Sequence, residues 1–583
     1  MSNKEFFHEK FDPIFGPPCS LRILMLTDDD GSFTKEHRFG LTELIHALKT
    51  SPHAYVSFAI TTAHRSHETG VMPFPKDAKI KDFRFDNPAH FNAADFDQIW
   101  LFGVGNYGPT STDALTEKEL RIVSQFMDNG GGVFATGDHE NLGADLCGRL
   151  PRVRSMRRWK FDYSAVLSPH SYLDYDESSG DAPPVLGPHR HDTLVPGHDA
   201  SFSFDDQSDD IPAPIIPKFY GYQNRFWSIQ YPHPLLCGPK GIINILPDHM
   251  HEGECVIPDD LTQSTTFDGY THAEYPIDAG IQAIPDVIAD GVIQPGHKTR
   301  LELKDSANGM PGQTQESSFL DVNVVADRFG VIGAYDGHVV KVGRVVVDST
   351  FHHFFNINLD GAHSNSSDPV KQLGFLASTE GQKSYDQIKS YFRNIALWLA
   401  PPAVQKCMFE NVLWVARWDS QIHMLAPGLS RDVYSWENLL AYGRQVREVL
   451  ERNNAARCTV VDWIFAQDNP LARFPWWELI NRPDPPPWDI RKVMTSPEVL
   501  VTATLGAIMG ELVRAAPSRN EEFRNALHRH MPKIMTAGTA TGLRQAASFF
   551  EECLAETTKF VQTVKNAAAA DQGNVNKKGE RKS

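Results

Sequence analysis

A short apolar strand followed by three ionisable residues is the stretch of this sequence best suited to chemistry. Residues 133–135 are apolar, and after a Thr-Gly pair come Asp138, His139 and Glu140, where the next helix should begin. A carboxylate beside an imidazole suits general acid and base catalysis near neutral pH, and it also suits binding of a divalent metal. Asp138 fits equally well as the cap of a helix. The turn is therefore a catalytic elbow, a metal site or a capped helix.

Polar residues also follow the other predicted strands. In open α/β sheets, ligands bind outside the carboxyl ends of the strands, so these positions are the natural candidates for a site. They are Asp28, Asp29 and Asp30 after the first strand, His64 after the second, Asp248, His249, His251, Glu252 and Glu254 after "GIINIL", and Asp336, His338, Asp348, His352 and His353 around the last two strands. Each group alone fits a turn, a cap or a solvated loop. Their joint occurrence at strand ends indicates one shared pocket.

The candidate residues divide into three roles. The predicted catalytic residues are Asp138, His139, Glu140 and His352. The predicted metal ligands are His249, His251, Glu252 and His353, and the predicted substrate-binding residues are Asp28, His64, Asp336 and His338. Imidazole and carboxylate without thiolate favour zinc, manganese or iron, and the sequence carries no nucleotide-cofactor motif. Three mechanisms stay open: attack by a metal-bound water, acid and base catalysis without metal, and Asp138 as a nucleophile that forms a covalent ester.

Alternating strand and helix patterns in the first 150 residues must position this site. Apolar strands are predicted at 21–27, 54–64, 96–103 and 133–135, with a helix over 35–50. A further helix starts at a capping box, in which Thr116 stands three residues before Glu119, and ends at three glycines. This rhythm predicts an α/β fold with a doubly wound, flavodoxin-like, mostly parallel sheet.

The chain is too long for one hydrophobic core, so we expect several regions. They are an N-terminal extension (1–20), an α/β domain (21–400) with loop insertions at about 160–235 and 255–320, an all-α C-terminal module (403–566) and a disordered tail (567–583). In the helical module, Ser435 and Ser496 fit N-caps, and Pro497 fits the first position of a helix.

Charge, apolar content and cysteine spacing narrow the protein's class. A formal net charge of −17 disfavours nucleic-acid binding. The basic run at 149–160 is interpreted as a solvated helix face or as partners for nearby acids, with a patch that binds an anionic substrate or a partner as the alternative. No apolar run reaches the ~20 residues that span a membrane. The N-terminus does not resemble a secretory signal, so we expect a cytoplasmic protein. Seven widely spaced cysteines without a CxxC pair predict free, mostly buried thiols.

Several segments resemble a known superfamily. Residues 96–103 and 115–138, with "HPLLCG" and the later "GRVVVDSTFHHFF", are similar to the class I glutamine amidotransferase-like superfamily, particularly its ThuA-like (trehalose-utilisation) branch. The resemblance covers about residues 20–400, and it implies a histidine near the elbow, which His139 matches with a shift. Glutamine amidotransferases carry a Cys nucleophile in a G-x-C-x-G turn. The turn here is Thr-Gly-Asp-His-Glu, and Cys147 lies too far along to replace that thiol, so glutaminase activity is not expected.

Two classes of function follow. The first is an enzyme, a hydrolase or a carbohydrate-related lyase or isomerase, that acts on a small-molecule substrate through the strand-end residues. The second is a catalytically inactive ligand-binding or scaffold protein whose C-terminal helices recruit a protein partner or self-associate. The density of imidazole and carboxylate at strand ends favours the enzyme, because a scaffold would not need it. Metal analysis of the purified protein separates the two classes best.

Overall fold

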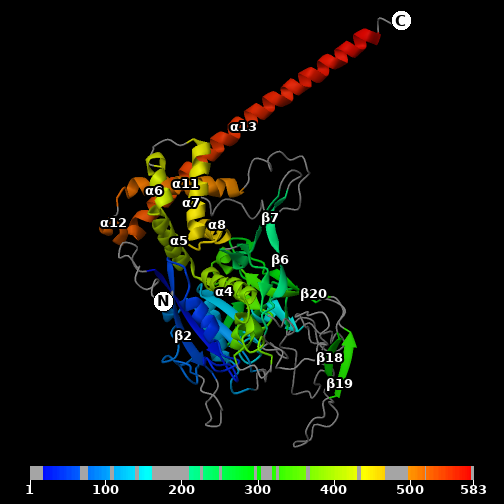
Figure 1. Cartoon of the computed structure of the whole chain (residues 1–583), viewed down its shortest axis with the longest axis vertical. Helices are drawn as coiled ribbons and strands as arrows, with labels where there is room; N and C mark the ends of the chain where they lie inside the picture. Colours follow the sequence, from blue (N-terminus) through cyan, green and yellow to red (C-terminus); the bar gives the residue numbers. More distant parts are fainter. Residues whose placement is uncertain are drawn as a thin grey trace, which may run out of the picture.

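The protein combines a large mixed sheet in its N-terminal part with a helical region at its C-terminus (Figure 1). The computed structural model describes residues 18–65, 77–105, 111–137, 143–159, 209–223, 228–239, 241–247, 253–293, 298–303, 318–323, 327–362, 368–429, 435–466, 497–518 and 520–579. The prediction of an α/β fold with a C-terminal all-α module is confirmed at this level.

Five parallel strands form one half of the main sheet. Their order is β2 (Val56–His64), β1 (Cys19–Thr27), β3 (Gln98–Gly103), β4 (Gly132–Gly137) and β21 (Val345–Asp348). Strands β1 to β4 are the four that the apolar runs predict. Because these five strands run in the same direction, their last residues meet at one edge of the sheet, which we call the carboxyl edge.

Four antiparallel strands extend the sheet beyond β21. They are, in order, β20 (Asp327–Tyr335), β17 (Asp286–Ile293), β6 (Ala213–Pro217) and β11 (Ile245–Leu246). Strands β6 and β17 lie in the two segments that the sequence predicts to be loop insertions, so that prediction is wrong for them. Strand β6 is a short run with proline within it and at its end, and only alternate residues are buried, so its apolar signal is weak.

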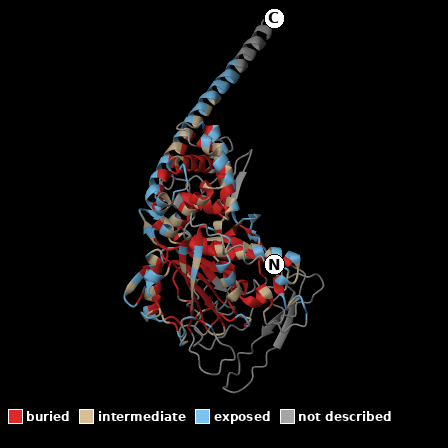
Figure 2. Ribbon diagram, turned by 60° about the vertical axis from the view of Figure 1, so that its left-hand side comes forward, coloured by how far each residue is buried: buried red, intermediate tan, exposed pale blue. Residues whose placement is uncertain are grey.

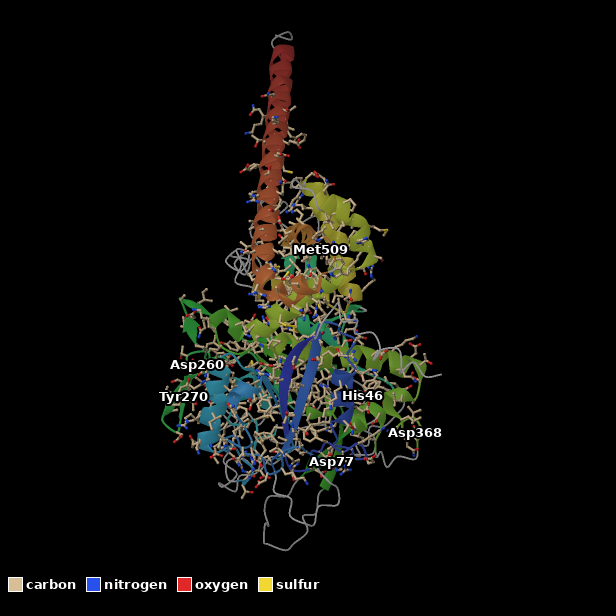
Figure 3. All side chains as sticks on the ribbon, turned by 90° about the vertical axis from the view of Figure 1, so that its left-hand side faces the viewer. His46, Asp77, Asp260, Tyr270, Asp368 and Met509 are labelled. Atoms are coloured by element: carbon tan, nitrogen blue, oxygen red, sulfur yellow. A yellow bond between two sulfur atoms is a disulfide. The ribbon has the colours of Figure 1, made fainter. Side chains whose placement is uncertain are left out.

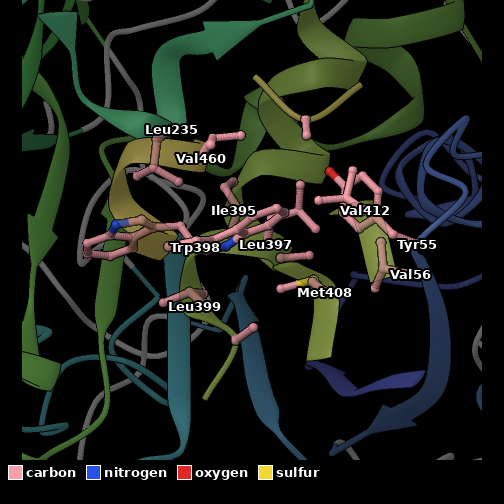
Figure 4. Packing of buried hydrophobic residues seen from close by; sticks show 14 of the residues in the cluster. Tyr55, Val56, Leu235, Ile395, Leu397, Trp398, Leu399, Met408, Val412 and Val460 are labelled. Carbon is pink, nitrogen blue, oxygen red and sulfur yellow. The ribbon is translucent and has the colours of Figure 1, made fainter. Parts of the chain in front are cut away.

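The two faces of the sheet carry separate hydrophobic cores, because alternate residues of each strand point to opposite sides. One core joins β1, β3 and β4 to helices α1 (Thr42–Lys49) and α4 (Thr379–Leu399), and it continues into the helical region. Figure 4 shows this continuity, with Ile395 and Trp398 of α4 among residues from the sheet and the helical region. The other core includes α2 (Glu117–Asp128), whose predicted Thr116–Glu119 capping box is confirmed.

Short antiparallel strand pairs and helical turns complete the α/β part. The pairs are β5 (Arg157–Trp159) with β12 (Gly253–Cys255), β7 (Phe219–Gln223) with β8 (Ser228–Pro232), β9 (Cys237–Gly238) with β10 (Gly241–Ile242), β13 (Ser264–Phe267) with β14 (Tyr270–Ala273), β15 (Ile277–Asp278) with β16 (Ile281–Gln282), and β18 (Lys298–Leu303) with β19 (Ser318–Asn323). After β21 come a 3-10 turn, η9 (Phe351–His353), and helix α3 (Asn356–Asp360). These two elements shape one side of the carboxyl edge.

The C-terminal region contains helices α5 (Pro402–Arg417), α6 (Ser420–Leu429), α7 (Trp436–Arg452), α8 (Arg457–Ala466), α11 (Pro497–Ala515), α12 (Glu521–Asn525) and α13 (Leu527–Gly579). The predicted N-cap Ser435 accepts a hydrogen bond from the backbone of Asn438, as expected. Helix α13 runs through most of the segment predicted to be a disordered tail, so 567–579 is helical. Its distal part projects away from the rest of the protein (Figures 1 and 2).

Two disulfides join the sheet region to the helical region. Cys19 at the start of β1 is bonded to Cys407 on α5, and Cys237 on β9 is bonded to Cys458 on α8. The prediction of free thiols is therefore wrong for these four residues, and it holds for Cys147, Cys255 and Cys553, of which the first two are buried. Among the described residues, no helix combines the length and apolar character needed to cross a membrane.

Candidate functional site

A buried histidine and aspartate stand together at the carboxyl end of β21. The Nδ1 atom of His353 lies 2.7 Å from Oδ1 of Asp348, and both side chains are fully buried. The same Oδ1 accepts a 3.3 Å hydrogen bond from the backbone N–H of Thr350, and Oδ2 accepts a 2.8 Å hydrogen bond from the Tyr391 hydroxyl. The carboxylate is thus fixed from three directions, and it fixes the imidazole in turn.

This arrangement selects one tautomer of His353. An ionised carboxylate accepts hydrogen bonds only, so Nδ1 must carry the proton that it donates to Asp348. The other ring nitrogen, Nε2, is buried and has no hydrogen-bond partner among the described residues. A neutral imidazole oriented in this way presents a lone pair at Nε2, which accepts a proton or binds a metal ion.

The local sequence explains why the turn after β21 takes this form. Thr350 caps η9 by accepting a hydrogen bond from the backbone of His352, which turns the chain directly after the strand. The Phe354 ring then packs against Phe102 and Phe134 beneath the edge, with ring centroids 5.7 Å and 5.0 Å apart. The apolar residues of "FHHFF" are therefore anchors, and they hold His353 against Asp348.

The neighbouring His352 has a different environment. Its Nδ1 lies 3.2 Å from Oδ1 of Asn358 on α3, and its ring packs against Phe351 at a centroid distance of 4.2 Å. The sequence assigns His352 to catalysis and His353 to metal binding. The structure pairs His353 with a carboxylate, the partner expected of a general base.

The His353–Asp348 pair lies beside the end of β4. Val347 pairs with Ala135 in parallel register, and the Thr136 hydroxyl lies 3.4 Å from the carbonyl oxygen of Asp348. The predicted elbow residues Asp138, His139 and Glu140 follow directly after β4, and they lie outside the described residues, as do Asp248, His249, His251 and Glu252.

A second acidic feature spans the carboxyl ends of β1 and β3. Oδ1 of Asp28 accepts hydrogen bonds from the backbone N–H groups of Val104 at 2.7 Å and Gly105 at 3.1 Å. Its other oxygen, Oδ2, is buried without a hydrogen-bond partner among the described residues. The strand order of the sheet reverses between β1 and β3, and such reversals are where open α/β sheets bind ligands.

Asp145 faces the same place. A Cβ on Gly105 would stand 2.7 Å from Oδ2 of Asp145 and 3.1 Å from Oδ2 of Asp28, so both carboxyl oxygens border the small space that this glycine leaves. Burial raises the pKa of Asp28 to about 8, with smaller contributions from Asp145 and Asp29, against the lowering effect of the two backbone N–H groups. At neutral pH Asp28 is therefore largely a neutral carboxylic acid, able to donate a proton.

His64, at the end of β2, has a role in holding the chain after β1. Its Nε2 lies 3.0 Å from the carbonyl oxygen of Gly31, and the side chain is buried. This contact holds the "TDDDGS" turn against the second strand. The sequence predicts His64 to bind substrate, and the geometry shows it supporting the turn that carries Asp28.

The turn after β20 lies at the opposite edge of the sheet. Strand β20 is antiparallel to β21, with Tyr335 opposite Val345, so Asp336 and His338 stand beside the beginning of β21. The expectation that these two residues share the pocket of His353 is wrong. Strand β20 runs antiparallel to β21, and an apolar pattern does not indicate strand direction. Asp336 instead pairs with Arg344 at 2.8 Å, and burial lowers the pKa of His338 to about 3.

Two arginines of the basic run at 149–160 form ion pairs with acidic residues. Within the basic run, Arg152 pairs with Asp128 and Arg154 pairs with Glu274, so these arginines serve as partners for nearby acids. Across the described parts of the chain, no three His, Cys, Asp or Glu side chains gather closely enough to hold a metal ion.

Three residues of this site carry no predicted role: Asp348, Asp145 and Tyr391. Asp348 is one of the strand-end residues, and its position five residues before His353 is the only sequence pattern that indicates their contact. Asp145 lies in "LGADLCG" and Tyr391 on the buried face of α4. For these two nothing local in the sequence marks the contact.

Comparison with known proteins adds no identification. No protein-family model matches the chain, and no curated protein is significantly similar to it.

Proposed function

We propose that this protein is an enzyme of the hydrolase class, in which His353 is the general base and Asp348 orients it. The observation that carries the proposal is the 2.7 Å contact between Nδ1 of His353 and Asp348, with Nε2 left without a partner in the described structure. Burying a carboxylate and an imidazole together is costly, and a purely structural pair would usually satisfy both ring nitrogens.

The proposed chemistry uses Nε2 of His353, the ring nitrogen that faces away from Asp348. Nε2 of His353 takes a proton from an attacking water or substrate hydroxyl, and Asp348 stabilises the imidazolium that results. The Tyr391 hydroxyl and the Thr350 N–H donate hydrogen bonds to Asp348 and hold it in place. Asp28, protonated near neutral pH, provides an acid at the neighbouring strand ends. A small polar substrate, such as a carbohydrate derivative, suits a site made of such groups; a lyase or isomerase would use the same base on a C–H bond.

The strand order supports placing this chemistry in an amidotransferase-like fold. The order β2-β1-β3-β4-β21 corresponds to the flavodoxin-like order 2-1-3-4-5. The ThuA-like resemblance implies a late strand followed by histidine, and β21 is followed by His353. We therefore propose a member of that superfamily that lacks the thiol nucleophile and works by acid and base catalysis.

A divalent metal is the second route that we propose for the same nitrogen. Neutral imidazole Nε2 with carboxylate on Nδ1 is the usual form of a metal-bound histidine, and zinc, manganese or iron fits the predicted His249, His251 and Glu252 set. Metal content, measured by mass spectrometry on protein purified without chelators, decides between the two routes. One equivalent of metal that is lost in His353→Gln supports the metal route.

The test of the enzyme proposal uses the full-length protein and a panel of p-nitrophenyl esters and methylumbelliferyl glycosides. We expect hydrolysis of at least one probe, with kcat/KM falling on the order of 100-fold or more in His353→Gln and Asp348→Asn. His46→Gln is the matched control, since His46 is an exposed residue of α1 (Figure 3), and it should keep full activity. Hydrolysis that survives in folded His353→Gln would refute the proposal. A protein with neither hydrolysis nor metal would support the ligand-binding or scaffold alternative.

A further inference from the structure

Helix α13 packs against the helical bundle through one continuous stripe. The stripe includes Met531, Ile534, Met535 and Ala546, all buried, and Gly538 and Gly542, which allow close approach to α11. At its outer end, Phe549 stacks on Trp436 of α7 and Phe550 meets the same ring edge-to-face, with ring centroids 5.2 Å and 6.0 Å away.

The same stripe continues where α13 leaves the bundle. Its next members are Leu554, Thr557, Phe560, Val561 and Val564, which we call the distal stripe. Leu554, Phe560, Val561 and Val564 are 56%, 68%, 45% and 50% exposed. Figures 1, 2 and 3 all show this part of the helix standing clear of the bundle. The apolar face that is buried along the bundle is therefore presented to solvent beyond it.

The spacing of the distal stripe is that of a coiled-coil seam. Phe550, Leu554, Thr557, Val561 and Val564 follow one another at alternating steps of four and three residues, the a and d positions of a heptad. Helices without tertiary packing are marginal in water, and a row of exposed large apolar side chains marks a contact surface. The seam thus predicts a second helix alongside.

We propose that the distal stripe binds the same stripe of a second copy of this chain, as an antiparallel pair of helices centred near Lys559. In this register Leu554 meets Val564 of the second copy, and Thr557 meets Val561 of the second copy. The seam is then apolar along its length except for the threonine layers.

The residues that flank the seam favour this partner and direction. On one flank, Glu551 comes to lie opposite Lys565 of the second copy, a complementary charge pair that occurs twice by symmetry. On the other flank, Phe560 meets Phe560 of the second copy. A parallel pair would instead place Phe560 beside Lys565 of the second copy and leave Glu551 without a basic partner.

The first experiment measures the mass of the full-length protein by sedimentation velocity over a range of concentrations. We expect a reversible dimer, and a dissociation constant at least 10-fold weaker in Val561→Asp/Val564→Asp. Ala555→Asp/Gln562→Asp places the same charges on the outer face of the same helix, where both residues are exposed, and should leave the dimer unchanged. A protein that is monomeric at every concentration, or a dimer that both double variants affect equally, would overturn the proposal.

The second experiment tests direction and register. Glu551→Lys and Lys565→Glu should each weaken the dimer several-fold, and the double variant should restore it. A short bismaleimide should link Phe560→Cys to itself more efficiently than Gln562→Cys. Additive losses in the double variant would exclude the antiparallel register. A monomer that Val564→Asp destabilises to heat would show instead that a segment of the same chain covers the stripe.

Discussion

Arg344 and Asp462 form a two-pronged ion pair that joins the sheet to the helical region, with N–O distances of 2.9 Å and 3.0 Å. Arg344 precedes β21, Asp462 lies on α8, and the same guanidinium also binds Asp336. One buried cation therefore balances two partly buried carboxylates that would otherwise repel each other.

Removing that cation should destabilise the protein strongly. Arg344→Met leaves Asp336 and Asp462 close together without a counter-charge, and breaking a buried pair in this way costs about 3–5 kcal/mol in free energy of unfolding. Arg328→Met is the matched control, because its ion pair with Asp290 is largely exposed and is worth less than about 1 kcal/mol. Urea unfolding of both variants provides the comparison. Equal shifts in the two midpoints would contradict the assigned role of Arg344.

Reduction of the disulfides should also destabilise the fold. Cys19–Cys407 and Cys237–Cys458 close loops with sequence separations of 388 and 221 residues. In the chain-entropy account, loops of this length are each worth at most roughly 5–6 kcal/mol, because the cross-link restricts the unfolded chain. Reductant should therefore lower the urea midpoint, and Cys458→Ser should lower it where Cys553→Ser does not. Thiol titration of the denatured, unreduced protein should find three free thiols among the seven cysteines; seven would contradict the pairing.

Local signals in the sequence were sufficient for the N-terminal elements. The Thr116–Glu119 box predicts the start of α2 because all of its hydrogen bonds lie within one turn. The apolar runs predict β3 and β4 because strands buried on both faces are apolar throughout. Strand direction and long-range pairing depend on contacts between distant parts of the chain. The local sequence therefore does not predict the pairing of β17, the sheet edge at which Asp336 lies, or the Cys19–Cys407 disulfide.

For the candidate site, the sequence predicts the position but not the partners of its residues. Its predicted position at strand ends follows from the general behaviour of α/β sheets, and Asp28 and His353 lie at such ends. The partner of each residue depends on contacts that no short motif encodes. Tyr391 contacts Asp348 although 43 residues separate them in sequence, and Asp145 and Asp28 both border the space beside Gly105.

Loss of the Tyr391 hydroxyl should change the site more than it changes the fold. Tyr391→Phe removes the 2.8 Å hydrogen bond to Oδ2 of Asp348, so the carboxylate that orients His353 is held less firmly. We expect about 1–3 kcal/mol of destabilisation and a several-fold fall in kcat/KM of the proposed reaction. Tyr385→Phe loses a comparable 2.9 Å bond to Glu43 and serves as control, with kcat/KM unchanged. An equal fall in kcat/KM in both variants would contradict the assigned contact.

The buried Asp28 carboxyl should make stability depend on pH in a defined direction. Its pKa of about 8 lies above the ordinary value of 3.8, so between these limits the folded protein retains a proton that the unfolded chain releases. The contribution of Asp28 to stability should therefore be greatest below about pH 4 and fall as pH rises toward 8. In Asp28→Asn this loss is absent, while Oδ1 still accepts from Val104 and Gly105. The variant's advantage in free energy of unfolding should grow across the window, to the order of 5 kcal/mol at about 1.4 kcal/mol per pH unit.

Urea unfolding at several pH values measures this difference in free energy, with Asp30→Asn as the control because the Asp30 side chain is 43% exposed. A difference between Asp28→Asn and wild type that stays constant with pH would show that Asp28 is already ionised in the folded protein.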